Sequence, residues 1–110
     1  MISHVLMFAL LAAAPQVNIN QARQSYSGCL GSLLRNNLKD RVAPDTFDTT
    51  LAASCKAEES AFRQAVVSAD VAAGTSRTSA EQGANFEITD MVENVKQTYK
   101  TYVETNTQPR

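Results

Sequence analysis

The sequence is poor in the residues from which active sites and nucleic-acid surfaces are built. It has no tryptophan, only 6% aromatic residues, and ten basic side chains against eleven acidic ones. So small a net charge and so few stacking rings give no reason to expect a nucleic-acid partner. One histidine and two cysteines exclude most metal sites and leave no general base for a hydrolytic triad. We therefore predict no enzyme, no cofactor and no bound metal.

Long apolar runs are scarce too, and the longest lies at the N-terminus. Residues 5–14 are all apolar, and no Lys, Arg, Asp or Glu precedes Arg23. The run is too short to cross a bilayer, which takes about 20 residues, but it is typical of a secretory signal peptide. We expect this signal over residues 1–22, which implies a periplasmic or secreted protein.

The sequence leaves the cleavage site open. Small residues end the run at Ala14, but Pro15 follows and hinders cleavage there, so cleavage after Ala22 is a plausible substitute. The alternative is an uncleaved apolar helix that packs on the domain or rests in the membrane interface. This run is the only membrane contact that we expect.

Proline and glycine, which interrupt helices, number only three and four. Between Pro15 and the tail, Pro44 and the loop-like cluster 74–79 are the two clear breaks. They predict three helices, over about 19–38, 46–73 and 79–104. Asp45 or Thr46 would cap the second helix, Gly74 would end it, and Thr78 or Ser79 would cap the third. We expect the domain over 23–106 and a frayed tail over 107–110.

Each predicted helix carries an apolar stripe with helical spacing. Residues 85–89 also alternate like a strand, and Gly83 lies inside the first turns of the third helix, so the start of that helix is poorly defined. Tyr99, Tyr102 and Phe86 are expected in the core or at the edge of the stripe. The fold class that follows is all-α, an antiparallel three-helix bundle.

The stripes of the first two helices face each other in register. Cys29 and Cys55, like Tyr26 and Glu58, have position numbers that add up to 84, as antiparallel partners about one turn must. With helix axes about 9 Å apart, facing Cα atoms lie within disulfide range. We predict a single interhelical disulfide, Cys29–Cys55, that stabilises the fold by about 3.5 kcal/mol.

Two further expectations follow from this packing. Gly28 and Gly31 flank Cys29, where close approach of the second helix would explain them. For the second and third helices, position numbers that add up to about 153 predict three pairs: Leu51 with Tyr102, Glu58 with Val95, and Ala65 with Ile88.

Glu58 is the one charged residue on a core stripe, and it forms a candidate buried polar pair with Tyr26. A buried carboxylate beside a tyrosyl hydroxyl would have a raised pKa, and such groups often mark functional sites. The alternative is an ordinary hydrogen bond, or a half-exposed carboxylate that reaches Arg23 or Lys96. No second acid, histidine or nucleophile is placed nearby to support catalysis.

Charge is unevenly distributed along the chain. The first helix and its turn carry Arg23, Arg35, Lys39 and Arg41 against Asp40, whereas the remainder is acidic. This asymmetry favours contact with an anionic envelope surface or an acidic partner. The alternative is that the charges neutralise one another within the bundle.

The sequence therefore predicts a non-catalytic exported helical domain that binds an unidentified macromolecule of the cell envelope or has a structural role there. The alternative is a carrier of a small molecule or lipid. Its apolar cavity between the helices would be lined by Phe47, Leu51, Phe62, Val92 and Val95.

Overall fold

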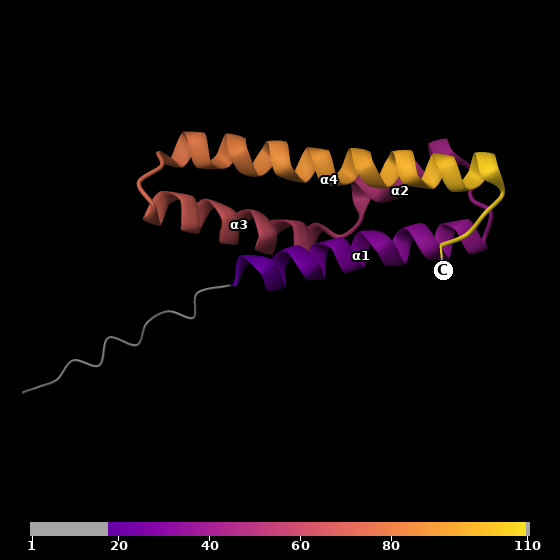
Figure 1. Cartoon of the computed structure of the whole chain (residues 1–110), viewed down its shortest axis with the longest axis horizontal. Helices are drawn as coiled ribbons and strands as arrows, with labels where there is room; N and C mark the ends of the chain where they lie inside the picture. The colour runs from indigo at the N-terminus through magenta and orange to yellow at the C-terminus, as the bar shows by residue number, and fades with distance from the viewer. Residues whose placement is uncertain (1–17, 110) are drawn as a thin grey trace, which may run out of the picture.

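The computed structural model describes residues 18–109, and this part of the chain is entirely helical apart from its turns. The helices are α1 (Ile19–Lys39), α2 (Pro44–Ala53), α3 (Lys56–Ala72) and α4 (Arg77–Thr105). α1 and α4 run in the same direction, and α2 and α3 return between them in succession (Figure 1). The all-α prediction is confirmed. Most of the expected signal peptide lies outside the described residues.

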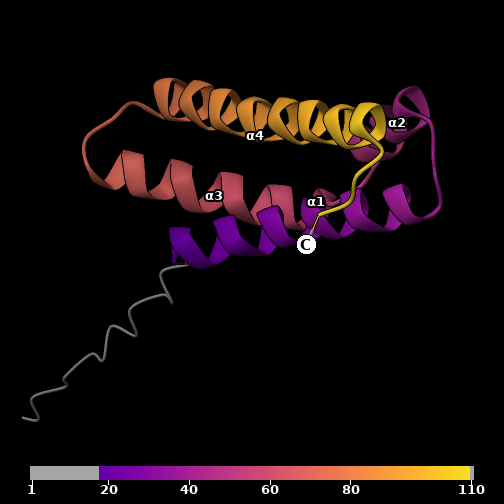
Figure 2. The ribbon, with the colours of Figure 1, turned by 45° about the vertical axis from the view of Figure 1, so that its right-hand side comes forward.

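The predicted second helix is wrong in one respect, because it is two helices. Ser54 is extended, with φ −112° and ψ 167°, and Cys55 is left-handed, with φ 57°. The last carbonyls of a helix lack partners within the helix. The hydroxyl of Ser54 satisfies one of them in α2 by donating a hydrogen bond to the carbonyl of Thr50 at 2.6 Å. Because of this break, residues 18–109 form four helices instead of three, and the short helix at right in Figure 2 is α2.

The helix caps differ from those expected. Asn18 caps α1 and Ser76 caps α4 through its side chain, whereas α2 begins with Pro44 at its first position and no side-chain cap. Ser76 takes the place predicted for Thr78 or Ser79, so α4 begins about two residues early. Gly74 adopts φ 102° after α3, as predicted for a left-handed helix end.

The core runs the length of the bundle. Phe47 and Phe62 are fully buried, and Tyr99 stacks on Phe47 with ring centroids 3.8 Å apart. Burial of such a ring contributes about 3 kcal/mol. Tyr26 stacks on Phe62 at 6.2 Å. Residues from all four helices complete the core: Ala22, Leu30, Leu34, Leu38, Leu51, Cys55, Ala65, Val66, Val67, Ala80, Ala84 and Ile88.

The register of α2 and α3 against α4 is shifted from the predicted one. Phe47 meets Tyr99, and Arg63 donates a hydrogen bond to Asn85. The position numbers of these pairs add up to 146 and 148 rather than 153. The early start of α4 moves the centre of the turn, and the break at Cys55 changes the path of α2. Residues 85–89, which alternate like a strand, are helical.

The disulfide is as predicted, with Cys29 bonded to Cys55 and their Cα atoms 6.0 Å apart. The explanation of the neighbouring glycines is wrong. A Cβ atom added at Gly28 would meet no atom within 4 Å, and one at Gly31 would meet only Arg35 of the same helix at 3.4 Å. Neither glycine makes room for α3.

Candidate functional site

Tyr26 and Glu58 are the predicted polar pair. Among the hydrogen bonds of residues 18–109, none joins these two side chains. Tyr26 is 2% exposed and stacks on Phe62, one turn beyond Glu58. Glu58 is half-buried. Burial raises the pKa of Tyr26, the carboxylate of Glu59 raises it further, and the Arg63 guanidinium offsets part of the change. The charged groups that act on Tyr26 are thus Glu59 and Arg63.

Arg23 connects the three helices beside Tyr26. Its guanidinium donates a hydrogen bond to Glu87 of α4 at 2.8 Å and lies over the Phe62 ring of α3, 5.3 Å from the centroid. The alternative interpretation, in which Glu58 pairs with Arg23, is wrong, because Arg23 pairs with Glu87 instead. Both ionic side chains are about 40% exposed, so the pair adds at most about 1 kcal/mol. This cluster joins α1, α3 and α4.

Glu58 lies closer to the disulfide. Its carboxylate and the Sγ atoms of Cys29 and Cys55 are within 4.8 Å of one another. Metal ions bind thiolates, and sulfurs bonded to each other offer none. In the oxidised protein this donor set therefore has no metal chemistry.

Two hollows on the described surface are open, and each is lined by polar and apolar side chains together. The larger, of about 350 Å³, lies between α3 and α4 and is lined by Arg63, Gln64, Val67, Ser68, Arg77, Glu81 and Asn85. The second, of about 330 Å³, lies between α1 and α3 beside Glu58. Neither is lined by any of the five residues predicted for a carrier cavity. Three of those residues are buried, and Val92 and Val95 are partly buried against the core.

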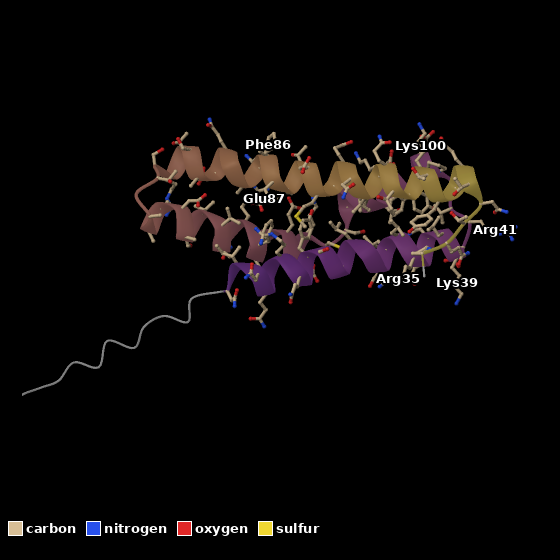
Figure 3. All side chains as sticks on the ribbon, viewed as in Figure 1. Arg35, Lys39, Arg41, Phe86, Glu87 and Lys100 are labelled. Atoms are coloured by element: carbon tan, nitrogen blue, oxygen red, sulfur yellow. A yellow bond between two sulfur atoms is a disulfide. The ribbon has the colours of Figure 1, made fainter. Side chains whose placement is uncertain are left out.

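Phe86 is the most exposed large apolar side chain of the described part, at 77%. It projects from the outer side of α4, away from the other helices (Figure 3). The prediction that it packs at the core or its edge is wrong. Phe86 is two residues from Ile88, and two residues turn a helix by about 200°. Its position opposite the stripe could have revealed this exposure in the sequence.

The surface around Phe86 is open. Gly83 lies one turn before it on the same side of α4, and a Cβ atom added there would meet nothing within 4 Å. We call Phe86 together with Gly83 the α4 knob. Burying an exposed aromatic ring in a partner's recess is a common source of binding energy, and a bare glycine lets another backbone approach closely.

Basic side chains gather at the other side of the molecule. Arg35, Lys39 and Arg41, which we call the basic end, are all exposed and project at the C-terminal end of α1 (Figure 3). None of the ion pairs among residues 18–109 includes them. Within the described part of the chain, Arg35 donates a hydrogen bond to the hydroxyl of Ser32 in its own helix.

None of the four helices is both long and apolar enough to span a membrane. Comparisons with protein-family models, with curated proteins and with solved structures find no match for this chain.

Proposed function

We propose that the chain is a small exported protein without catalytic activity that binds another protein of the cell envelope through the α4 knob. The exposure of Phe86 supports this proposal. A ring that is 77% exposed adds little to the stability of the fold and costs solubility. An apolar recess on a protein partner would bury it.

Two features support the exported part of the proposal. The apolar run 5–14 precedes the domain, and the disulfide is of the kind that persists in oxidising compartments. Cleavage near Ala14 suits the fold better than cleavage after Ala22. Asn18 caps α1, and Ala22 is 6% exposed in the core, so the later cut would remove the cap and first turn.

Mass spectrometry of the protein from its native host tests export. We expect a chain that begins between about residues 14 and 23, recovered outside the cytoplasm. An intact Met1 on a soluble cytoplasmic protein would contradict the proposal.

Affinity capture tests the role of the knob. The baits are the oxidised wild-type protein, Phe86→Ser, and Val103→Ser, which alters another exposed apolar residue of α4 at 41% exposure. From envelope extracts we expect one protein to bind the wild type and Val103→Ser at least tenfold better than Phe86→Ser, since an aromatic anchor contributes about 2 kcal/mol or more. All three baits should melt at the same temperature. Equal recovery on all three would overturn the proposal.

A further inference from the structure

α1 differs from the other helices in charge. Its 21 residues include Arg23, Arg35 and Lys39 but no aspartate or glutamate. The other three helices together carry ten acidic side chains and five basic ones. α1 also forms the edge of the bundle that faces away from α4 (Figure 1). On the side of the molecule that α1 forms, α1 itself therefore contributes no acidic group.

The cations of the basic end are available to a partner. Arg23 is engaged with Glu87, whereas the basic end makes no ion pair among the described residues. Asp40 lies in the same turn and is exposed, which leaves a net charge of plus two over residues 35–41. The same cations also stabilise the C-terminal end of α1 through the helix dipole. This structural role needs no lipid, so the experiment below must distinguish it from binding.

The outer face of α1 is otherwise small and polar. Along it, Gln24, Ser25, Gly28 and Ser32 are exposed at the three- and four-residue spacing of one helix face. No large apolar side chain projects there, and nothing lies within 4 Å of the position of a Cβ atom at Gly28. Such a face suits a flat, hydrated, negatively charged surface, because it has nothing to insert into hydrocarbon.

The geometry points to the basic end and the outer face of α1 as a docking face for an anionic phospholipid surface, with α4 on the opposite side turned toward water. Glu58 of α3 borders this face beside Ser25, so the basic end supplies the attraction. Each basic residue near such a surface raises the partition coefficient roughly fivefold, so three give about a hundredfold. The contact is reversible and weakens with salt, since charges are screened over about 10 Å at 0.1 M. This contact uses residues separate from the α4 knob and does not depend on the protein proposed to bind the knob.

Vesicle co-sedimentation tests the inference with the oxidised protein in the form isolated from its host. The vesicles are phosphatidylcholine alone or with about a third phosphatidylglycerol, in about 0.05 M or 0.3 M salt. One variant replaces all three residues of the basic end by glutamine. The matched control removes the same charge elsewhere: Lys56→Gln, Arg77→Gln and Lys100→Gln.

We expect the wild type to bind anionic vesicles at low salt and to release them at high salt. The basic-end variant should bind about a hundredfold less, and the control within about threefold of the wild type. Circular dichroism must show that both variants are folded. A lowered melting temperature would reveal a helix-dipole effect on stability, whereas lost binding alone leaves the melting temperature unchanged. Equal losses in the two variants, or no preference of the wild type for anionic vesicles, would overturn the inference.

Discussion

The two halves of the bundle, on either side of the break at Cys55, both pack around buried rings but differ in their polar contacts. In the α2 half, Phe47 and Tyr99 stack at 3.8 Å, and the Tyr99 hydroxyl donates a hydrogen bond to the carbonyl of Val42 at 2.5 Å. In the α3 half, Tyr26 and Phe62 stack at 6.2 Å beneath partly exposed ion pairs. Ion pairs of this kind contribute about 0–1 kcal/mol each, so buried rings dominate in both halves.

Truncating one ring in each half gives the largest effect and tests whether the halves unfold together. Phe47→Ala and Phe62→Ala should each lower the free energy of unfolding by about 3–5 kcal/mol, because both rings are fully buried. Urea unfolding followed by circular dichroism should show a single transition for both variants. A two-step curve for either would show that the halves are independent.

Removing the disulfide tests the junction of the two halves. Cys29→Ser should lose about 2–4 kcal/mol, as expected for a crosslink across 26 residues. Cys55→Gly should lose about 1 kcal/mol less than Cys55→Ser, because glycine adopts the positive φ of this residue without strain. Thermal unfolding measures both. An unchanged melting temperature in Cys29→Ser would contradict a stabilising bond.

The tyrosyl hydroxyls distinguish the halves more finely. Tyr99→Phe removes the hydrogen bond to Val42 and should cost about 1 kcal/mol. Tyr26→Phe should cost less than about 0.5 kcal/mol, since among the described residues no hydrogen bond includes the Tyr26 hydroxyl. Chemical denaturation of the two variants gives the comparison, and equal losses would refute it.

The ion pair of the α3 half should have a smaller effect still. Glu87→Gln should cost at most about 1 kcal/mol, and less in high salt, because the pair with Arg23 is about 40% exposed. A salt titration of the unfolding midpoint measures the difference from the wild type. A loss above about 2 kcal/mol that persists in high salt would show a stronger role for the pair.

Alkaline pH tests the same tyrosines with the smallest expected change. Burial raises the pKa of both Tyr26 and Tyr99 above the ordinary value of 10.0. The stabilisation that this represents is fully present below pH 10 and is lost as pH rises through the raised folded-state values. Unfolding curves above pH 10 should fall less steeply in Tyr26→Phe and in Tyr99→Phe. Identical slopes in wild type and variants would contradict this linkage.

The sequence predicts the disulfide correctly because two cysteines placed symmetrically about a turn need only the local register around them. It predicts Gly74 correctly because glycine is the usual residue at a left-handed helix end. The break at Ser54 and Cys55 carries no such signal, since neither residue is glycine or proline. Cys55 and Arg41 also occupy left-handed positions. Cys55 is held by the disulfide, and Arg41 lies in the turn that ends α1, where the amides of Arg41 and Val42 donate hydrogen bonds to the carbonyls of Leu38 and Asn37.

The surface features divide in the same way. The basic first helix is visible as a charge count, whereas the exposure of Phe86 depends on which side of α4 faces the core. The apolar spacing from Ile88 onward contains that information, but the strand-like alternation over 85–89 obscures it. The shift of the α3–α4 turn follows from the cap at Ser76, one of several serines and threonines able to cap at that place.

The covalent link at Cys55 also determines how the protein would respond to tension. A force applied between the two ends of the chain passes through the sulfur–sulfur bond and bypasses the segment between the cysteines. That segment, which spans 26 positions, includes the C-terminal half of α1 and all of α2. Stretching the oxidised protein would leave about 90 Å of contour length concealed, and a reducing agent would release it.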